Sequence, residues 1–367
     1  MIAELITPVV VLCLLTLLLA LLMVIAESFI SNYGECTITV NQEKNISVRG
    51  GSSLLSSLAQ ADIFIPSACG GRGSCGLCKL TIREPEPTHL PTELPWLDPD
   101  ERGNGVYLSC QQKVKQDMRI DIPQELLAIQ RFRARVERLA DLTPDIKEVV
   151  LTLEEPAEIT FTAGQFIQFE VPEYAGSEEP VYRAYSIASA PAQKQRISLH
   201  VKYVPEGICT TYIHRFLKSG DPVTFNGPYG DFTLSANTRD AYFVAIGSGM
   251  APVASILLDM ADTGVQRNAT YFFGARHRCG LFLMDEMRAL EHRLPDFRFV
   301  PTLSRPKPED RWTGHVGRVT QLLESYVDDA CDKEFYFCGN PHMIDACLAI
   351  LRRRGVAEDC IFFDKFA

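Results

Sequence analysis

The longest uninterrupted pattern of hydrophobic positions lies at the start of the chain. Residues 5–26 carry no charge, and only Thr7, Pro8 and Thr16 interrupt the apolar run. Because about 20 apolar residues span a bilayer as a helix, the run predicts a transmembrane anchor within residues 1–30. A signal peptide and a buried soluble helix are the alternatives. No Lys or Arg precedes the run, however, and a soluble helix usually carries a polar stripe.

Residues 31–128 show short alternating runs separated by turn residues. Alternation with a period of two is typical of strands, and these are expected at 36–40, 46–49, 79–83 and 118–122. An amphipathic helix is expected at 53–60. The proline-rich, acidic segment 84–100 is predicted to be a surface loop, and 123–128 a linker. The pattern indicates a compact, β-rich domain.

Two further patterns divide the rest of the chain. Residues 129–235 contain six strand-like runs and one helix, which predicts an antiparallel barrel. The strands are expected at 132–136, 148–153, 166–171, 185–188, 197–203 and 223–225, and the helix at 210–217. In residues 236–367, apolar strands alternate with helices, which predicts a parallel sheet covered on both faces. These strands are expected at 242–246, 270–273, 297–302 and 335–338, and the helices at 252–261, 283–294, 319–327 and 343–353.

Composition narrows the class of protein. With 46% hydrophobic and 22% charged residues the 367-residue chain can bury several cores, which excludes global disorder. The net charge of −10 and the absence of a basic run argue against a nucleic-acid partner. Eight of the twelve cysteines are scattered without paired spacing, as expected for a reducing compartment.

The other four cysteines have the most informative spacing in the chain. Cys69, Cys75 and Cys78 form a C-x5-C-x2-C pattern in a glycine-rich loop, and Cys110 follows 32 residues later. A [2Fe–2S] cluster requires four thiolates, and a flexible loop can aim backbone N–H groups at its sulfurs. A structural zinc site, the alternative, more often has two C-x2-C pairs. The spacing predicts a protein that transfers electrons.

Several short motifs are candidates for nucleotide binding. Gly247 and Gly249 follow an apolar strand and precede Pro252 in a predicted helix, a setting that lets a pyrophosphate approach the backbone. The third glycine of the dinucleotide fingerprint is missing, so a purely structural turn is the alternative. Arg183, in the run Arg183-Ala184-Tyr185-Ser186 at an expected strand start, can bind a phosphate, and Tyr185 can stack on a flavin.

Three further parts of the chain have both a functional and a structural interpretation. The single barrel helix is preceded by Gly207 and begins with Thr210 and Thr211, and a phosphate can bind at such a helix start. Helix capping by the two threonines is the commoner role. Cys338 and Gly339 end the last buried strand, where α/β sheets bind ligands, but a cysteine there is often a small buried hydrophobe. Phe366 lies in a tail that frays unless a strand at 360–363 docks.

The chain resembles the ferredoxin–flavin–nicotinamide reductases over nearly its whole length. Within them it is most similar to the F subunits of bacterial sodium-translocating NADH:quinone oxidoreductases. The resemblance is carried by the C-x5-C-x2-C spacing, Pro91-Thr92-Glu93-Leu94, Cys110-Gln111 through Val114-Lys115 to Asp117-Met118, and Pro308-Glu309-Asp310 with Trp312-Thr313-Gly314. It implies a transmembrane helix (1–30), a β-grasp-like α+β [2Fe–2S] ferredoxin domain (31–128), a β-barrel FAD domain (129–235) and an α/β NADH domain (236–367).

The resemblance also implies roles for individual residues. The four cysteines would be the cluster ligands, and Ser186, Cys338 and Phe366 would lie at the reacting rings, with Phe366 stacked on the flavin. FAD would contact Arg183, Tyr185, Ser186, Gly207, Thr210 and Thr211. NADH would contact Gly247, Gly249, Pro252, Gly274, Arg276 and Gly339.

The implied function is electron input to a membrane complex. NADH would reduce FAD, and electrons would pass singly to the cluster, to partner membrane subunits and finally to ubiquinone. The soluble domains would be cytoplasmic, beneath a single pass through the bacterial inner membrane. Sodium transport would reside in the partner subunits, because one apolar helix offers no ion path. The alternatives are the NADH-dependent reductase component of a di-iron monooxygenase or aromatic-ring dioxygenase, and an anchored electron-transfer module without NADH activity.

Overall fold

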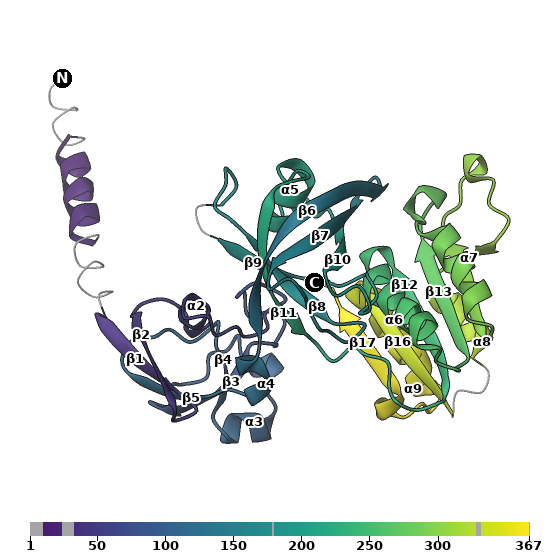
Figure 1. The fold of residues 1–367 in the computed structure, drawn as a ribbon. Coiled ribbons are helices and arrows are strands. Elements are labelled where there is room, and N and C mark those ends of the chain that lie inside the picture. The colour runs from purple at the N-terminus through teal and green to yellow at the C-terminus, as the bar shows by residue number, and fades with distance from the viewer. Residues whose placement is uncertain (1–9, 24–32, 178–179, 328–331, 367) are drawn as a thin grey trace. The chain divides into compact units, whose positions relative to one another are not determined.

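The computed structural model describes residues 10–23, 33–177, 180–327 and 332–366 (Figure 1). The chain divides into two compact units. The first unit contains residues up to 65 together with 71–128. The second contains the short segment 66–70 and residues 129–367.

The first unit is built on a mixed five-stranded sheet. The strand order is β2-β1-β5-β3-β4, and only β1 and β5 are parallel. The strands are β1 (Glu35–Val40), β2 (Lys44–Arg49), β3 (Lys79–Glu84), β4 (Val106–Leu108) and β5 (Met118–Asp121). Helix α2 (Leu54–Gln60) begins at Ser53, whose hydroxyl accepts the Ser56 N–H at 3.1 Å. Leu54 and Leu58 are fully buried with Ile38 and Ile120 in one core, as the alternating pattern predicts.

Two predictions for this unit are wrong in part. The expected loop 84–100 contains the short helix η1 (Leu94–Trp96) and the start of α3 (Pro99–Gly103). Asp98 and Glu101 form a capping box around Pro99, which starts that helix despite its polar sequence. The expected linker 123–128 contains α4 (Gln124–Leu127), and the three-residue strand β4 was too short to produce a pattern.

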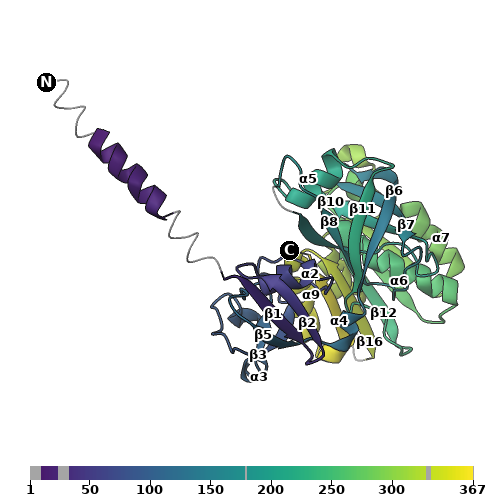
Figure 2. The same ribbon diagram turned by 60° about the vertical axis from the view of Figure 1, so that its left-hand side comes forward.

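The second unit begins with the predicted antiparallel barrel (Figure 2). Its order is β10-β7-β6-β11-β8-β9, with a bridge between Ile187 and Leu199 joining the two ends. The strands are β6 (Gln130–Thr143), β7 (Ile146–Glu155), β8 (Phe166–Val171), β9 (Val181–Ser186), β10 (Arg196–Lys202) and β11 (Pro222–Tyr229). Phe132 and Phe225 stack in its core with ring centroids 5.0 Å apart. Helix α5 (Ile208–Arg215) begins and ends two residues earlier than expected.

The rest of the unit is a parallel sheet with helices on both faces (Figure 1). The order is β15-β14-β13-β12-β16-β17. The strands are β12 (Asp240–Ile246), β13 (Ala269–Ala275), β14 (Phe297–Leu303), β15 (His315–Val316), β16 (Lys333–Gly339) and β17 (Ile361–Lys365). Phe243, Tyr271 and Tyr336 share a core with α6 (Met250–Thr263) and α7 (Met284–Arg293). Val244 and Phe337, on the opposite face, pack with α8 (Val319–Tyr326) and α9 (Pro341–Arg353).

A buried ion pair joins the loop between α6 and β13 to strand β16. Arg267 Nη2 lies 2.6 Å from Glu334 Oε2, and both side chains are almost fully buried. The hydroxyls of Ser235 and Tyr336 donate to the same carboxylate at 2.6 Å. Burial by itself raises the pKa of Glu334, but the bonds from Ser235, Tyr336 and Arg267 outweigh it and lower the pKa to about 2. The pair is therefore ionised and satisfied.

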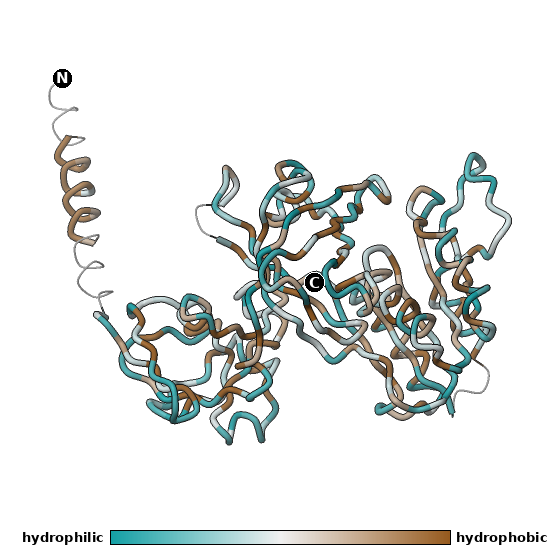
Figure 3. Tube along the Cα trace, viewed as in Figure 1, coloured by the Kyte–Doolittle hydropathy of each residue, from teal (hydrophilic) through white to brown (hydrophobic). Residues whose placement is uncertain are grey.

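Residues 10–23 form an apolar helix at the N-terminal end (Figure 3). Its leucines are exposed along its length. Among the residues described, no helix combines the length and the apolar character needed to cross a membrane. The predicted anchor also includes residues 1–9 and 24–30, which lie outside the described residues.

Candidate cofactor sites

The cluster loop has a backbone that favours glycine. Gly71, Gly73 and Gly76 have φ values of +86°, +74° and +70°, in the left-handed region. The loop leads into β3 at Cys78, and the N–H of Ser109 donates to the Cys78 carbonyl at 2.8 Å. This bond holds Cys110 near Cys78, although the two are far apart in sequence.

The thiols of Cys78 and Cys110 interact directly. The pKa of the Cys78 thiol is raised well above its usual value. The causes are a hydrogen bond to Cys110, burial, and the negative charge of Cys110 when that thiol is ionised. Two buried, facing cysteines suit ligation, because a bound metal deprotonates coordinating thiols. Cys75, the next ligand candidate in this unit, is half-buried, and Cys69 lies in the segment that groups with the second unit.

A [2Fe–2S] cluster has two irons, and its four cysteines are shared between them, two on each iron. Within the described ranges, no three His, Cys, Asp or Glu side chains are grouped so as to hold a metal ion. The four-cysteine set therefore stays a prediction that depends on the spacing, while the Cys78–Cys110 contact fits it.

Glu93 anchors the neighbouring loop, a role that sequence reasoning missed. Its fully buried carboxylate accepts hydrogen bonds of 2.8 Å from the Leu90 and Leu108 N–H groups and from Gln112. These bonds hold residues 90–96 against the segment that carries Cys110. Trp96 in turn packs on Gly76, where an added Cβ would lie 2.7 Å from its ring. The Pro91–Leu94 motif was the available signal, but its partners are distant in sequence.

The predicted flavin residues lie on one barrel strand. Arg183 lies in the middle of β9, and Tyr185 and Ser186 end it, whereas the sequence analysis expected this run at a strand start. Strand alternation puts Arg183 and Tyr185 on the same face, paired with Phe169 and Ile167 of β8. The Tyr185 hydroxyl is buried with no hydrogen-bond partner, and burial raises its pKa. An orphaned buried hydroxyl is costly, so its presence fits a bound group with polar atoms.

The prediction that threonines cap the barrel helix is wrong. Gly207 is the N-cap of α5 and supplies no side-chain hydrogen bond. Thr210 lies inside the helix, where its hydroxyl accepts the Val204 N–H and lies within bonding distance of the Val204 carbonyl, both at 3.1 Å. Thr211 donates its backbone N–H to the Gly207 carbonyl. The first turn of α5 therefore has no side-chain cap, which leaves its N–H groups as donors for a phosphate.

The predicted nicotinamide residues meet at the carboxyl ends of β12 and β16. Gly247–Gly249 forms the short helix η2, which leads directly into α6, as the motif predicts. A Cβ added to Gly249 would lie 2.3 Å from the Cys338 carbonyl oxygen, so only glycine permits this approach. Cys338 is fully buried, and burial followed by the charge of Asp364 raises the pKa of its thiol.

The C-terminal strand docks beside Cys338, as the sequence suggested for a functional Phe366. Strand β17 pairs with β16, with Asp364 opposite Cys338. Burial raises the pKa of Asp364 to about 6, and sequence reasoning missed this residue because nothing local marks it. The Phe366 side chain packs on the core of the parallel sheet.

The remaining predicted residues occupy the same edge of the sheet. Gly274 is the penultimate residue of β13 and pairs with Ile246. A Cβ added there would lie 3.0 Å from Val319, which indicates a packing role. Arg276 follows β13 and is exposed. Pro252 is buried in the first turn of α6.

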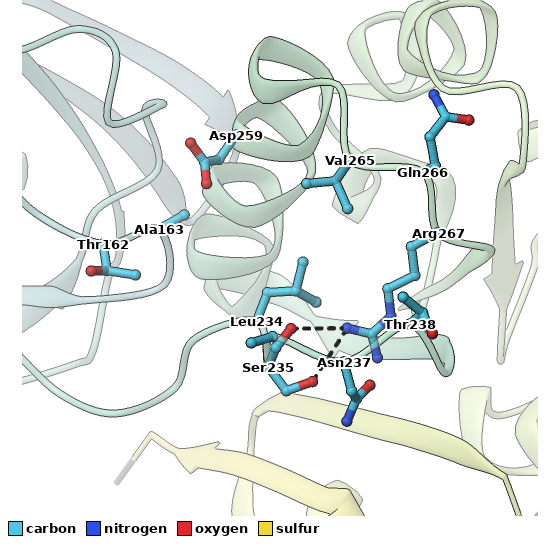
Figure 4. A pocket seen from close by; sticks show the side chains of 11 residues that line it. Thr162, Ala163, Leu234, Ser235, Asn237, Thr238, Asp259, Val265, Gln266 and Arg267 are labelled. Carbon is cyan, nitrogen blue, oxygen red and sulfur yellow. Dashed lines mark hydrogen bonds between the residues drawn. The ribbon is translucent and has the colours of Figure 1, made fainter.

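A cavity of about 370 Å³ lies away from these residues (Figure 4). Thr162, Ser235, Asp259 and Arg267 are among its lining residues, and Arg267 also belongs to the buried ion pair. The cavity contains none of the predicted site residues.

Comparison with known proteins decides the family. Three family models match successive stretches of the chain. They are a 2Fe-2S iron-sulfur cluster binding domain at 38–115, an oxidoreductase FAD-binding domain at 133–234 and an oxidoreductase NAD-binding domain at 243–348. The F subunit of the Na(+)-translocating NADH-quinone reductase of Neisseria meningitidis serogroup B is 34% identical, over 99% of both chains. Its Klebsiella pneumoniae counterpart is 35% identical over the same shares. The chain belongs to this F-subunit family.

Membership of the F-subunit family confirms the family predicted from sequence and makes the chain an oxidoreductase with [2Fe–2S], FAD and NAD domains. Solved structures agree on the fold. The Amycolatopsis cytochrome P450 reductase GcoB has a TM-score of 0.71 at 26% identity, covering 90% of this chain and 98% of its own. A ferredoxin reductase in carbazole 1,9a-dioxygenase has a TM-score of 0.69 at 24% identity, covering 91% and 99%.

Proposed function

We propose that this chain is the electron-input subunit of a membrane NADH:quinone oxidoreductase. The observation that carries the proposal is the end-to-end match to the F-subunit relatives, which includes all three cofactor domains. A bound FAD would supply the chemistry that links the two-electron oxidation of NADH to the one-electron steps that a [2Fe–2S] cluster accepts. The protein supplies orientation and electrostatics, and the proposal requires no acid–base dyad.

The chain's own residues have distinct tasks in this proposal. Arg183 and the open first turn of α5 bind the FAD phosphates, while Tyr185 and Ser186 orient the flavin ring. Gly247 and Gly249 admit the NADH pyrophosphate, and the buried Cys338 lies near the nicotinamide. Cys69, Cys75, Cys78 and Cys110 are the proposed cluster ligands.

We further infer a membrane location and an electron-accepting partner subunit. The apolar N-terminal segment supports a single-pass anchor in a bacterial inner membrane with the soluble domains in the cytoplasm, and the relatives' name supports sodium pumping by a multisubunit complex. Leu77, Leu94 and Trp96 are 42%, 43% and 39% exposed beside the cluster loop. Exposed apolar groups next to an electron-transfer centre suit the docking of a partner subunit.

Two measurements on the detergent-solubilised full chain test this function. NADH-dependent reduction of ferricyanide is expected, and its absence from flavin-loaded protein would exclude NADH oxidation. The Cys75→Ala variant should lose the visible absorption of the cluster while its FAD remains reducible by NADH. The matched control is Cys279→Ala, which changes an exposed cysteine outside the quartet and should retain both cofactors.

Copurification tests the partner. Mild detergent extraction should recover the chain with multispanning quinone-reductase subunits, and Trp96→Asp should weaken that recovery without changing ferricyanide reduction. Recovery with an oxygenase would instead support the second candidate, an oxygenase reductase component. The structural similarity to the cytochrome P450 reductase is the observation that favours this candidate.

A further inference from the structure

The Gln111 side chain touches a proposed cluster ligand. Its Nε2 lies 3.4 Å from Cys110 Sγ, and its Oε1 accepts a hydrogen bond of 2.9 Å from the Thr92 hydroxyl. A thiolate sulfur can only accept hydrogen bonds, so a ligating Cys110 requires the NH₂ end of the amide to face it. The amide oxygen then faces Thr92, whose hydroxyl must be the donor.

The surrounding chain is shaped around this amide. An added Cβ at Gly73 would lie 2.6 Å from Gln111 Nε2, so a side chain at that position would displace the amide. Thr92 precedes the fully buried Glu93, whose three hydrogen bonds hold this segment in place. The segment that carries Thr92 is therefore held by groups other than the amide itself.

We propose that Gln111 is a positioning residue that raises the reduction potential of the cluster through an N–H···S hydrogen bond to Cys110, with Thr92 orienting the amide. Reduction adds one electron to the cluster and makes its sulfurs more negative. A hydrogen-bond donor therefore stabilises the reduced form more than the oxidised form. The inference depends on the proposed function only in requiring that the cluster is present.

The test is an EPR-monitored redox titration of the full chain, with a chemical reductant and mediators. Gln111→Leu keeps a similar side-chain volume and removes the donor, so the cluster midpoint should shift to a more negative potential. Thr92→Val should shift it in the same direction by less, because the amide remains but is no longer oriented. Gln116→Leu is the matched control: this exposed glutamine lies five residues further on, and its loss should leave the midpoint unchanged.

Each outcome decides the proposal. An unchanged midpoint in Gln111→Leu, with normal iron and acid-labile sulfide content, overturns it, as does an equal shift in Gln116→Leu. If Gln111→Leu fails to incorporate the cluster, Thr92→Val decides, and an unchanged midpoint there overturns the proposal. The titration uses neither NADH nor a partner subunit, so a negative result leaves the proposed function intact, whereas wild-type protein without a cluster would defeat that function.

Discussion

The backbone N–H of Phe366 donates a hydrogen bond of 2.9 Å to the carbonyl oxygen of Gly339. The penultimate residue of the chain is thereby attached to the carboxyl end of β16, directly after Cys338. Strand β17 continues this attachment, since it pairs with β16 from Ile361 to Lys365. The C-terminal tail is therefore part of the proposed nicotinamide site.

Removing the Phe366 ring should tighten nucleotide binding. If the ring occupies the place that nicotinamide must take, Phe366→Ala abolishes a stacking contact worth about 0.5–1.5 kcal/mol. The Kd for NAD⁺, followed by the change in flavin absorbance, should then fall about 2- to 10-fold. Phe363→Ala is the control, because Phe363 lies on the preceding strand β17 and is 46% exposed. Equal Kd values for the wild type and Phe366→Ala would contradict a stacked ring.

The close approach of Gly249 to Cys338 predicts a selective loss of NADH oxidation. A Cβ at Gly249 overlaps the Cys338 carbonyl, so Gly249→Ala must push β16 and η2 apart, at about 1–3 kcal/mol of overpacking. Ferricyanide reduction by NADH should fall at least tenfold while FAD and iron contents stay normal. Gly103→Ala, where an added Cβ meets no atom within 4 Å, should retain the wild-type rate. A normal rate in Gly249→Ala would argue against nucleotide binding at this turn.

Arg183 should be required for flavin retention. Losing one charge-assisted phosphate contact costs about 1.5–3 kcal/mol, which corresponds to roughly a 10- to 150-fold weaker Kd for FAD in Arg183→Leu. Arg196→Leu removes a 44%-exposed guanidinium from another strand of the same barrel and serves as the control. Flavin and iron are measured in purified protein, and only flavin should decrease. Unchanged flavin content in Arg183→Leu would refute the phosphate role.

The Arg267–Glu334 pair should make stability depend on pH. Glu334→Gln leaves Arg267 without its partner charge in a buried setting, and breaking such a pair costs about 3–5 kcal/mol of the free energy of unfolding. Because the folded-state pKa of Glu334 lies near 2, below its ordinary 4.5, the carboxylate's contribution is complete above pH 4.5 and is lost as the pH falls toward 2.

The measurement is denaturant unfolding of wild type and variant across this range. The difference between their free energies of unfolding should be constant from pH 7 to 5 and should shrink below pH 5. Glu358→Gln, at a site where the side chain is 88% exposed, should show no comparable difference. If the stability difference between wild type and Glu334→Gln stayed the same from pH 7 to pH 2.5, the ionisation of Glu334 would be excluded as the cause of the pH dependence.

Features whose signal is local could be predicted from the amino-acid sequence. Period-two alternation and turn residues located most strands of the five-stranded sheet and the barrel. The apolar runs around Phe243, Tyr271 and Phe337 indicated a third sheet that is buried on both faces, as the two cores confirm. Cysteine spacing and short motifs were sufficient for the family and its cofactors, because ligand spacing and glycine turns are written in consecutive residues.

Contacts between residues far apart in the sequence became visible only in the folded chain. The buried carboxylate of Glu93 binds groups 15 and 19 residues away, the Arg267–Glu334 pair joins positions 67 residues apart, and Phe366 is held by Gly339. Such contacts form because burial forces each polar group to find a partner, and the partner depends on how strands and loops pack rather than on local sequence. For the same reason, a short strand such as β4 and the exact end of β9 could be located only in the folded chain.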